Sequence, residues 1–143
     1  MLGRDLDDAE AWVRSWAAQA SARSEAAAQM ANEVAALSST AEDSGGAITV
    51  AVDASGLITR LELTDSVRGL RGAELAAEIM RTVRRAQAGL TARVATVVAA
   101  TVGSDTETGS AVIGSFERRF PQPMDGDGLD GDGLDGDGRA RRG

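Results

Sequence analysis

The stretch AITVAVDASGLITRLEL, at residues 47–63, constrains the fold more than any other part of the chain. Apolar residues alternate with polar or small ones in both of its halves, which is the period-2 pattern of half-buried strands. Between the halves, Gly56 completes a compact turn, because glycine adopts positive φ at little cost. The expected inward-facing residues of this antiparallel β-hairpin are Ile48, Val50, Val52, Leu61 and Leu63. A lone hairpin is only marginally stable in water, so helices, a second hairpin or both must cover it.

Two long helices are predicted on either side of the hairpin, from about residue 5 to 38 and from about residue 73 to 101. The linker 38–46 is polar and ends in two glycines. The first helix carries an apolar seam with heptad-like spacing at Leu6, Ala9, Val13, Trp16, Ala20, Ala27, Met30, Val34 and Leu37. This seam either packs on the second helix of its own chain or also on a partner chain. We favour the partner chain, since so long a seam otherwise exposes apolar surface.

The amino acids that the chain lacks argue against catalysis. It has no His, Cys or Tyr, and all 15 of its basic residues are Arg. The usual general bases, thiol nucleophiles and Schiff-base formers are therefore absent. We expect a protein that is not an enzyme, with no cofactor, no metal site and no small-molecule substrate. No apolar run reaches the roughly 18 residues of a membrane span, so we expect a cytoplasmic protein with no membrane partner.

The sequence predicts three regions of different character. Residues 1–102 form the helix–hairpin–helix domain, and 103–124 form a loop followed by a segment with two Phe that can dock on the helices. Residues 125–143 repeat Asp and Gly with almost nothing to bury, so disorder is expected there. An EF-hand loop needs a bidentate Glu that this tail lacks, which argues against specific calcium binding. Removing 125–143 should leave the fold intact.

Arginines on the second helix and near the hairpin are the candidate contacts for nucleic acid. Arg81 and Arg85 are four residues apart, which puts them on one helix face, with Arg84 beside them. The full candidate set is Arg81, Arg84, Arg85, Arg60, Arg68 and Arg71. For each of them, the alternative is a solvated or ion-paired surface side chain. The net charge of −7 opposes long-range attraction to DNA.

Residues from about 5 to 102 resemble the YbaB/EbfC family of small bacterial nucleoid-associated proteins. The resemblance lies in the strand entry 45–52, Gly56 in the turn, Leu61 and Leu63 on the second strand, and Ala86 followed by Gln87. It implies an α-β-α protomer in an intertwined homodimer whose helices project like tweezers. It also implies binding to duplex DNA with little sequence preference. The all-Arg, Ala-rich composition suggests an actinobacterial-type member.

Two functions follow from these observations. In the first, a nucleoid-associated homodimer binds duplex DNA through phosphate contacts, with Ile48, Val50, Val52, Leu61 and Leu63 at its dimer interface. Arg suits this task because it binds phosphate by bidentate hydrogen bonds that do not read sequence. In the second, the chain is a non-enzymatic cytosolic accessory protein that contacts secretion-system proteins, because similar domains occur in proteins associated with type VII secretion. The acidic tail could compete with DNA for the arginines.

Overall fold

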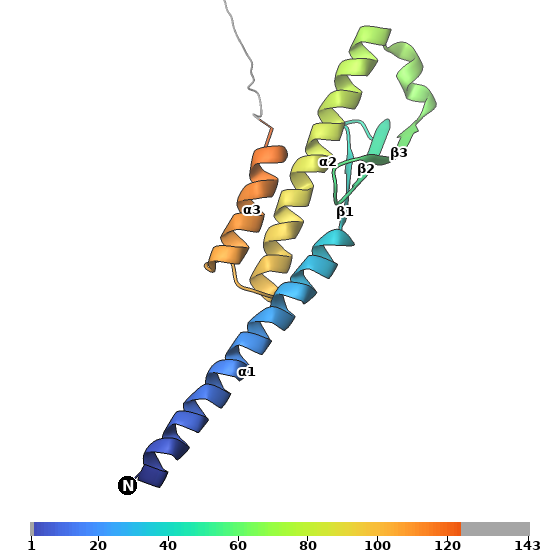
Figure 1. Cartoon of the computed structure of the whole chain (residues 1–143). Helices are drawn as coiled ribbons and strands as arrows, with labels where there is room; N and C mark the ends of the chain where they lie inside the picture. Colours follow the sequence, from blue (N-terminus) through green and yellow to red (C-terminus); the bar gives the residue numbers. More distant parts are fainter. Residues whose placement is uncertain (1, 124–143) are drawn as a thin grey trace, which may run out of the picture.

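The computed structural model describes residues 2–123 and has an α+β architecture of one sheet and three α-helices (Figure 1). The elements in chain order are α1 (Leu2–Ala35), β1 (Ser38–Glu42), β2 (Ile48–Asp53), β3 (Ile58–Leu63), the 3₁₀ helix η1 (Asp65–Gly69), α2 (Gly72–Ala100) and α3 (Glu107–Arg119). The sheet is antiparallel with strand order β1-β2-β3. The predicted succession of long helix, antiparallel hairpin and long helix is confirmed. The Asp/Gly tail lies outside the described residues.

Helix α1 is a long arm that joins the body of the molecule only at its C-terminal end (Figure 1). Its 34 residues rise by about 51 Å. Near its end, Met30 is buried, and Val34 and Leu37 pack against the same core. The N-terminal half of the predicted seam is different, because Leu6, Val13 and Trp16 are all more than half exposed, as is Trp12 beside the seam. The protomer therefore covers only the last part of the seam.

The hairpin of β2 and β3 forms as the alternating pattern predicts. Val50 pairs with Leu61 and Ile48 pairs with Leu63, so these side chains share one face of the sheet. The turn is closed by Gly56 at φ 87°. A Cβ at this glycine would collide with the Phe120 ring, and the Gly56 carbonyl accepts a hydrogen bond from Gln87 Nε2 at 3.1 Å. Gly56 thus joins the hairpin to both α2 and the end of α3.

The segment predicted as a polar linker contains strand β1 instead. Its register on β2 runs from Ser38 opposite Asp53 to Glu42 opposite Thr49. The polar sequence SSTAE does not predict a strand, because the inward side chains of β1 are small. Ser39 is buried against Gly89 of α2, where an added Cβ would lie only 2.5 Å from the Ser39 hydroxyl. The small side chain of Ser39 thus lets the strand pack closely against α2 at Gly89.

The core lies between α2 and one face of the sheet. It contains Met30, Ile48, Val50, Val52, Val83, Ala86, Leu90, Val94, Val98 and Phe116. Helix α2 packs on β1 and β2, and the side chains of Ile48, Val50 and Val52 are fully buried. The same face continues onto β3, where Leu61 and Leu63 are 45% and 43% exposed. The apolar face of the sheet therefore extends beyond the cover that α2 provides.

Helix α3 begins inside the predicted loop 103–110 and runs back along α2 (Figure 1). The hydroxyl of Thr106 caps it by accepting a hydrogen bond from the Gly109 backbone N–H at 3.0 Å. Phe116 is buried against α2, and Arg119 lies over the rings of both Phe116 and Phe120, 4.5 and 5.2 Å from their centroids. The two Phe that suggested docking thus hold a complete helix against α2.

The Asp53 carboxylate organises the hairpin turn and makes it sensitive to acid. It accepts hydrogen bonds from the Ser55 hydroxyl and from the backbone N–H groups of Ser55 and Leu57, at 2.6, 2.9 and 3.1 Å. These bonds, the Ser55 hydroxyl first, lower the pKa of Asp53 from its ordinary value. The depressed pKa means that the bonds stabilise the fold above the unfolded-state pKa of about 3.9. This contribution disappears as the pH falls through the lower, folded-state pKa.

We therefore expect Asp53→Ala to lower the melting temperature at pH 7 and to differ progressively less from wild type as the solution is acidified towards pH 3. The control is Asp53→Asn, which keeps an acceptor oxygen but cannot titrate, and which should melt between the two. Thermal unfolding followed by circular dichroism across this pH range measures the difference. A constant gap between Asp53→Ala and wild type at every pH would contradict the role assigned to the carboxylate.

Candidate nucleic-acid interface

Helix α2 carries the three central candidate arginines on its solvent side. Leu75, Ile79, Val83 and Ala86 face the core, while Arg81, Arg84 and Arg85 are exposed. At the start of the helix, the backbone N–H of the N-cap residue Arg71 donates to Glu74 Oε1 at 2.9 Å. Helical geometry brings Arg81, Arg84 and Arg85 within about one turn of one another. They form a compact cationic surface, here called the α2 arginine face.

The other three candidates lie elsewhere on the protomer. Arg60 is on β3, Arg68 is in η1, and Arg71 directly precedes α2. From Arg71 to Arg81 the helix rises by about 15 Å. The structure therefore divides the predicted set into the α2 arginine face and a second group near η1 and β3.

Carboxylates lie close to four of the six candidates. The guanidinium–carboxylate distances are 3.7 Å for Arg60–Glu62, 3.5 Å for Arg68–Asp65, 3.6 Å for Arg71–Glu74 and 3.2 Å for Arg81–Glu78. All four pairs are substantially exposed, so each adds little stability and leaves its Arg able to exchange partners. Within residues 2–123, Arg84 and Arg85 have no carboxylate at ion-pair distance. They are the strongest candidates for an external anion.

Two arginines outside the predicted set lie near this region. Arg118 and Arg119 occupy the last turn of α3, which runs back along α2. The Phe120 carbonyl accepts from the Thr91 hydroxyl at 3.3 Å, and Gln122 Nε2 donates to the Ala88 carbonyl at 3.5 Å. Along α2, these bonds bring Gln122, just after α3, to within about one turn of Arg84 and Arg85. The sequence FERRF shows two adjacent arginines, but only the docking of α3 brings these arginines towards α2.

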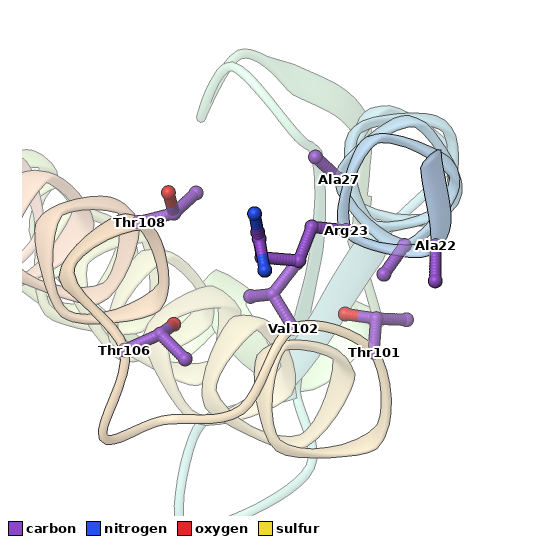
Figure 2. A pocket seen from close by; sticks show the side chains of 8 residues that line it. Ala22, Arg23, Ala27, Thr101, Val102, Thr106 and Thr108 are labelled. Carbon is purple, nitrogen blue, oxygen red and sulfur yellow. The ribbon is translucent and has the colours of Figure 1, made fainter. Parts of the chain in front are cut away.

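A groove of about 280 Å³ separates the middle of α1 from the junction between α2 and α3. Its lining residues are Ala22, Arg23, Ala26, Ala27, Thr101, Val102, Thr106 and Thr108. Figure 2 shows the Arg23 side chain extending from α1 into the space in front of α3. Among the described residues that line this groove there is no carboxylate, so they supply no acid–base pair for catalysis.

The acidic side chains and the helices bear on two other kinds of site, a metal centre and a membrane span. Within residues 2–123, no cluster of three or more potential ligands could hold a metal ion. None of the described helices is both long enough and apolar enough to span a membrane.

The fold and its surface define a small α+β protein whose distinctive feature is a set of exposed arginines on a helix–sheet–helix scaffold. The family model of the YbaB/EbfC DNA-binding family matches residues 12–104, more than half of the chain, and the chain belongs to this family. The predicted membership is thereby confirmed, and the family is one of nucleoid-associated DNA-binding proteins. The chain matches no curated protein and no solved structure at a significant level.

The matched region contains most of α1, the whole sheet and α2, and it ends before α3 begins. It includes Gly56 and Gln87, two residues on which the resemblance was based. Their hydrogen bond ties the hairpin turn to α2. These residues therefore support the fold, whereas the arginines form its charged surface.

Proposed function

We propose that this protein binds duplex DNA in the cytoplasmic nucleoid as a homodimer, through phosphate contacts with little sequence preference. The observation that carries the proposal is the exposure of Arg84 and Arg85, without carboxylate partners in the described part of the chain, on α2 of a member of a DNA-binding family. Arg81 adds a third guanidinium that can exchange Glu78 for a phosphate. Guanidinium groups bind phosphate oxygens in bidentate geometry, which orients a protein on DNA without reading bases.

The exposed apolar face of β3 supports the proposed homodimer. Strand β3 is exposed along its whole length, and Leu61 and Leu63 continue the apolar face of β2. A second protomer that covers this face would bury four leucines in a symmetric contact. The side chains of Ile48, Val50 and Val52 are enclosed in the protomer core, so the proposed interface rests on Leu61 and Leu63.

A salt titration of the wild-type protein tests this proposal. Each phosphate neutralised contributes a slope of about −0.9 to log affinity against log salt, so four to six contacts give a slope on the order of −4 to −5. We expect this slope on two duplexes of unrelated sequence, with nearly equal affinities, measured by fluorescence anisotropy. Absence of binding at low salt would reject the proposal, and a large difference between the two duplexes would reject its lack of sequence preference.

A second candidate function has its own supporting observation. Leu6, Trp12, Val13 and Trp16 are each more than half exposed on the arm of α1, and apolar helix faces of this kind bind partner helices. This arrangement suits a non-enzymatic accessory protein that contacts secretion-system proteins. A folded protein that fails to bind either duplex at low salt would make this the better proposal.

A further inference from the structure

The last described residues lie beside the middle of α2. After α3, the Phe120 carbonyl accepts from Thr91, and Gln122 Nε2 donates to the Ala88 carbonyl. Ala88 comes only one turn after Arg84 and Arg85, and α3 runs towards the N-terminal end of α2 (Figure 1). The chain therefore leaves the described structure next to the α2 arginine face.

The sequence that follows is the most acidic block of the chain. Asp occurs at positions 125, 127, 130, 132, 135 and 137, and the first basic residue after them is Arg139. The α2 arginine face contains two guanidinium groups without carboxylate partners within residues 2–123, and Arg118 and Arg119 lie at the end of α3. Carboxylates bind guanidinium groups by the same charge-assisted geometry as phosphates do. The acidic block is therefore complementary in charge to the α2 arginine face, and it follows shortly after Gln122, which contacts α2 beside that face.

The acidic block is long enough to reach the α2 arginine face. Along α2, Ala88 and Arg81 are separated by about 10 Å, while an extended block of thirteen residues reaches about 43 Å. A short tether also raises the local concentration of the acidic block to the millimolar range.

We propose that the acidic block 125–137 binds the α2 arginine face of its own chain and competes there with phosphate. The docking is inferred from the point at which the chain leaves the described structure and from charge complementarity. The competition with DNA rests on the proposed function. A ligand that needs an unoccupied surface binds with an affinity reduced by the unoccupied fraction. If the block covers the arginines 70–90% of the time, DNA affinity falls by about threefold to tenfold.

Paramagnetic relaxation tests the docking without DNA. The chain has no cysteine, so Leu134→Cys provides a single site for a nitroxide label on the full-length protein. We expect broadening of the backbone amides from residue 81 to 88, greater than that of residues 6–20 on the arm of α1. The broadening should vanish at about 0.5 M salt, where the Debye length is only a few ångströms.

The matched control replaces all six Asp of the block by Asn and keeps the label, the length and the terminal arginines. Equal broadening in this control, or no selective broadening in the native tail, would overturn the docking. Adding Arg84→Ala and Arg85→Ala to the labelled native protein should also remove the effect, and its persistence would contradict the assigned surface.

Measurements of DNA binding then distinguish the docking of the acidic block from the proposed binding of DNA. The Asp→Asn tail and removal of 125–143 should each tighten duplex binding by about threefold to tenfold at low salt, with an unchanged melting temperature. Selective broadening together with no DNA binding by any variant would reject the proposed function and leave the docking supported. Tighter DNA binding without selective broadening would mean that the tail acts only through net charge, and would overturn the docking.

Discussion

Leu61→Asp is expected to convert the proposed homodimer into a folded monomer. Leu61 is 45% exposed on β3, so an Asp side chain there can remain hydrated in a single protomer. In the proposed dimer, two-fold symmetry would bury two such carboxylates without partners, which costs several kcal/mol for each if they stay charged. Light scattering at micromolar concentration should show wild type at about twice the chain mass of 14.7 kDa and the variant at that mass.

Arg60→Gln is the matched control for this dissociation. It changes the net charge by the same −1 at the neighbouring position, but on the opposite face of β3. This variant should remain dimeric, and circular dichroism should show native helix content in both proteins. A wild-type protein that is monomeric, or a Leu61→Asp variant that stays dimeric, would show that the exposed face of β3 is not the interface.

Joint replacement of Arg84 and Arg85 by Ala is expected to remove most of the DNA binding. A homodimer loses four arginines, so the salt slope should shrink by roughly 3 to 4 if each contacts a phosphate. With about 0.5 kcal/mol for each lost contact, the affinity falls by roughly thirtyfold. The loss should be the same on both duplexes, because phosphate contacts carry no sequence information. Fluorescence anisotropy over a range of salt concentrations measures both quantities.

The control pair for this loss is Arg14→Ala with Arg23→Ala. It removes the same charge from α1 and leaves the α2 arginine face intact. A general effect of net charge would weaken DNA binding equally in both double variants, whereas a local interface predicts a much larger loss for Arg84 and Arg85. Both replacements leave the buried stripe of α2 unchanged, so similar melting temperatures should confirm that the fold is retained.

The strongest local patterns in the sequence predicted the corresponding parts of the fold. Alternation in 47–63 and the turn at Gly56 predicted the hairpin, and helical spacing predicted one shared surface for Arg81 and Arg85. Strand β1 was not predicted, because its inward residue Ser39 is small and packs on Gly89, fifty residues further along the chain. Such a long-range fit has no signature in a short window of sequence.

The candidate site was less predictable than the fold. Helical periodicity grouped the arginines of α2, but the sequence alone could not tell which of them have a carboxylate within reach. Arg60 pairs with Glu62 across the strand surface, and Arg81 with Glu78 along the helix, while Arg84 and Arg85 do not pair in the described structure. The heptad spacing predicted an apolar seam on α1, but it could not tell which part of that seam the protomer itself covers and which part, at Val13 and Trp16, stays exposed.

The contact between Phe120 and Gly56 has a practical consequence for defining the unit that folds. The family match ends at residue 104, yet a Cβ at Gly56 would meet the Phe120 ring, and Phe116 belongs to the buried core. A protein cut at the edge of the family match would lose α3 and the contacts that Phe120 and Gly109 make with Thr91 and Val98. We therefore expect the unit that folds stably to extend beyond the family match and to include Phe120.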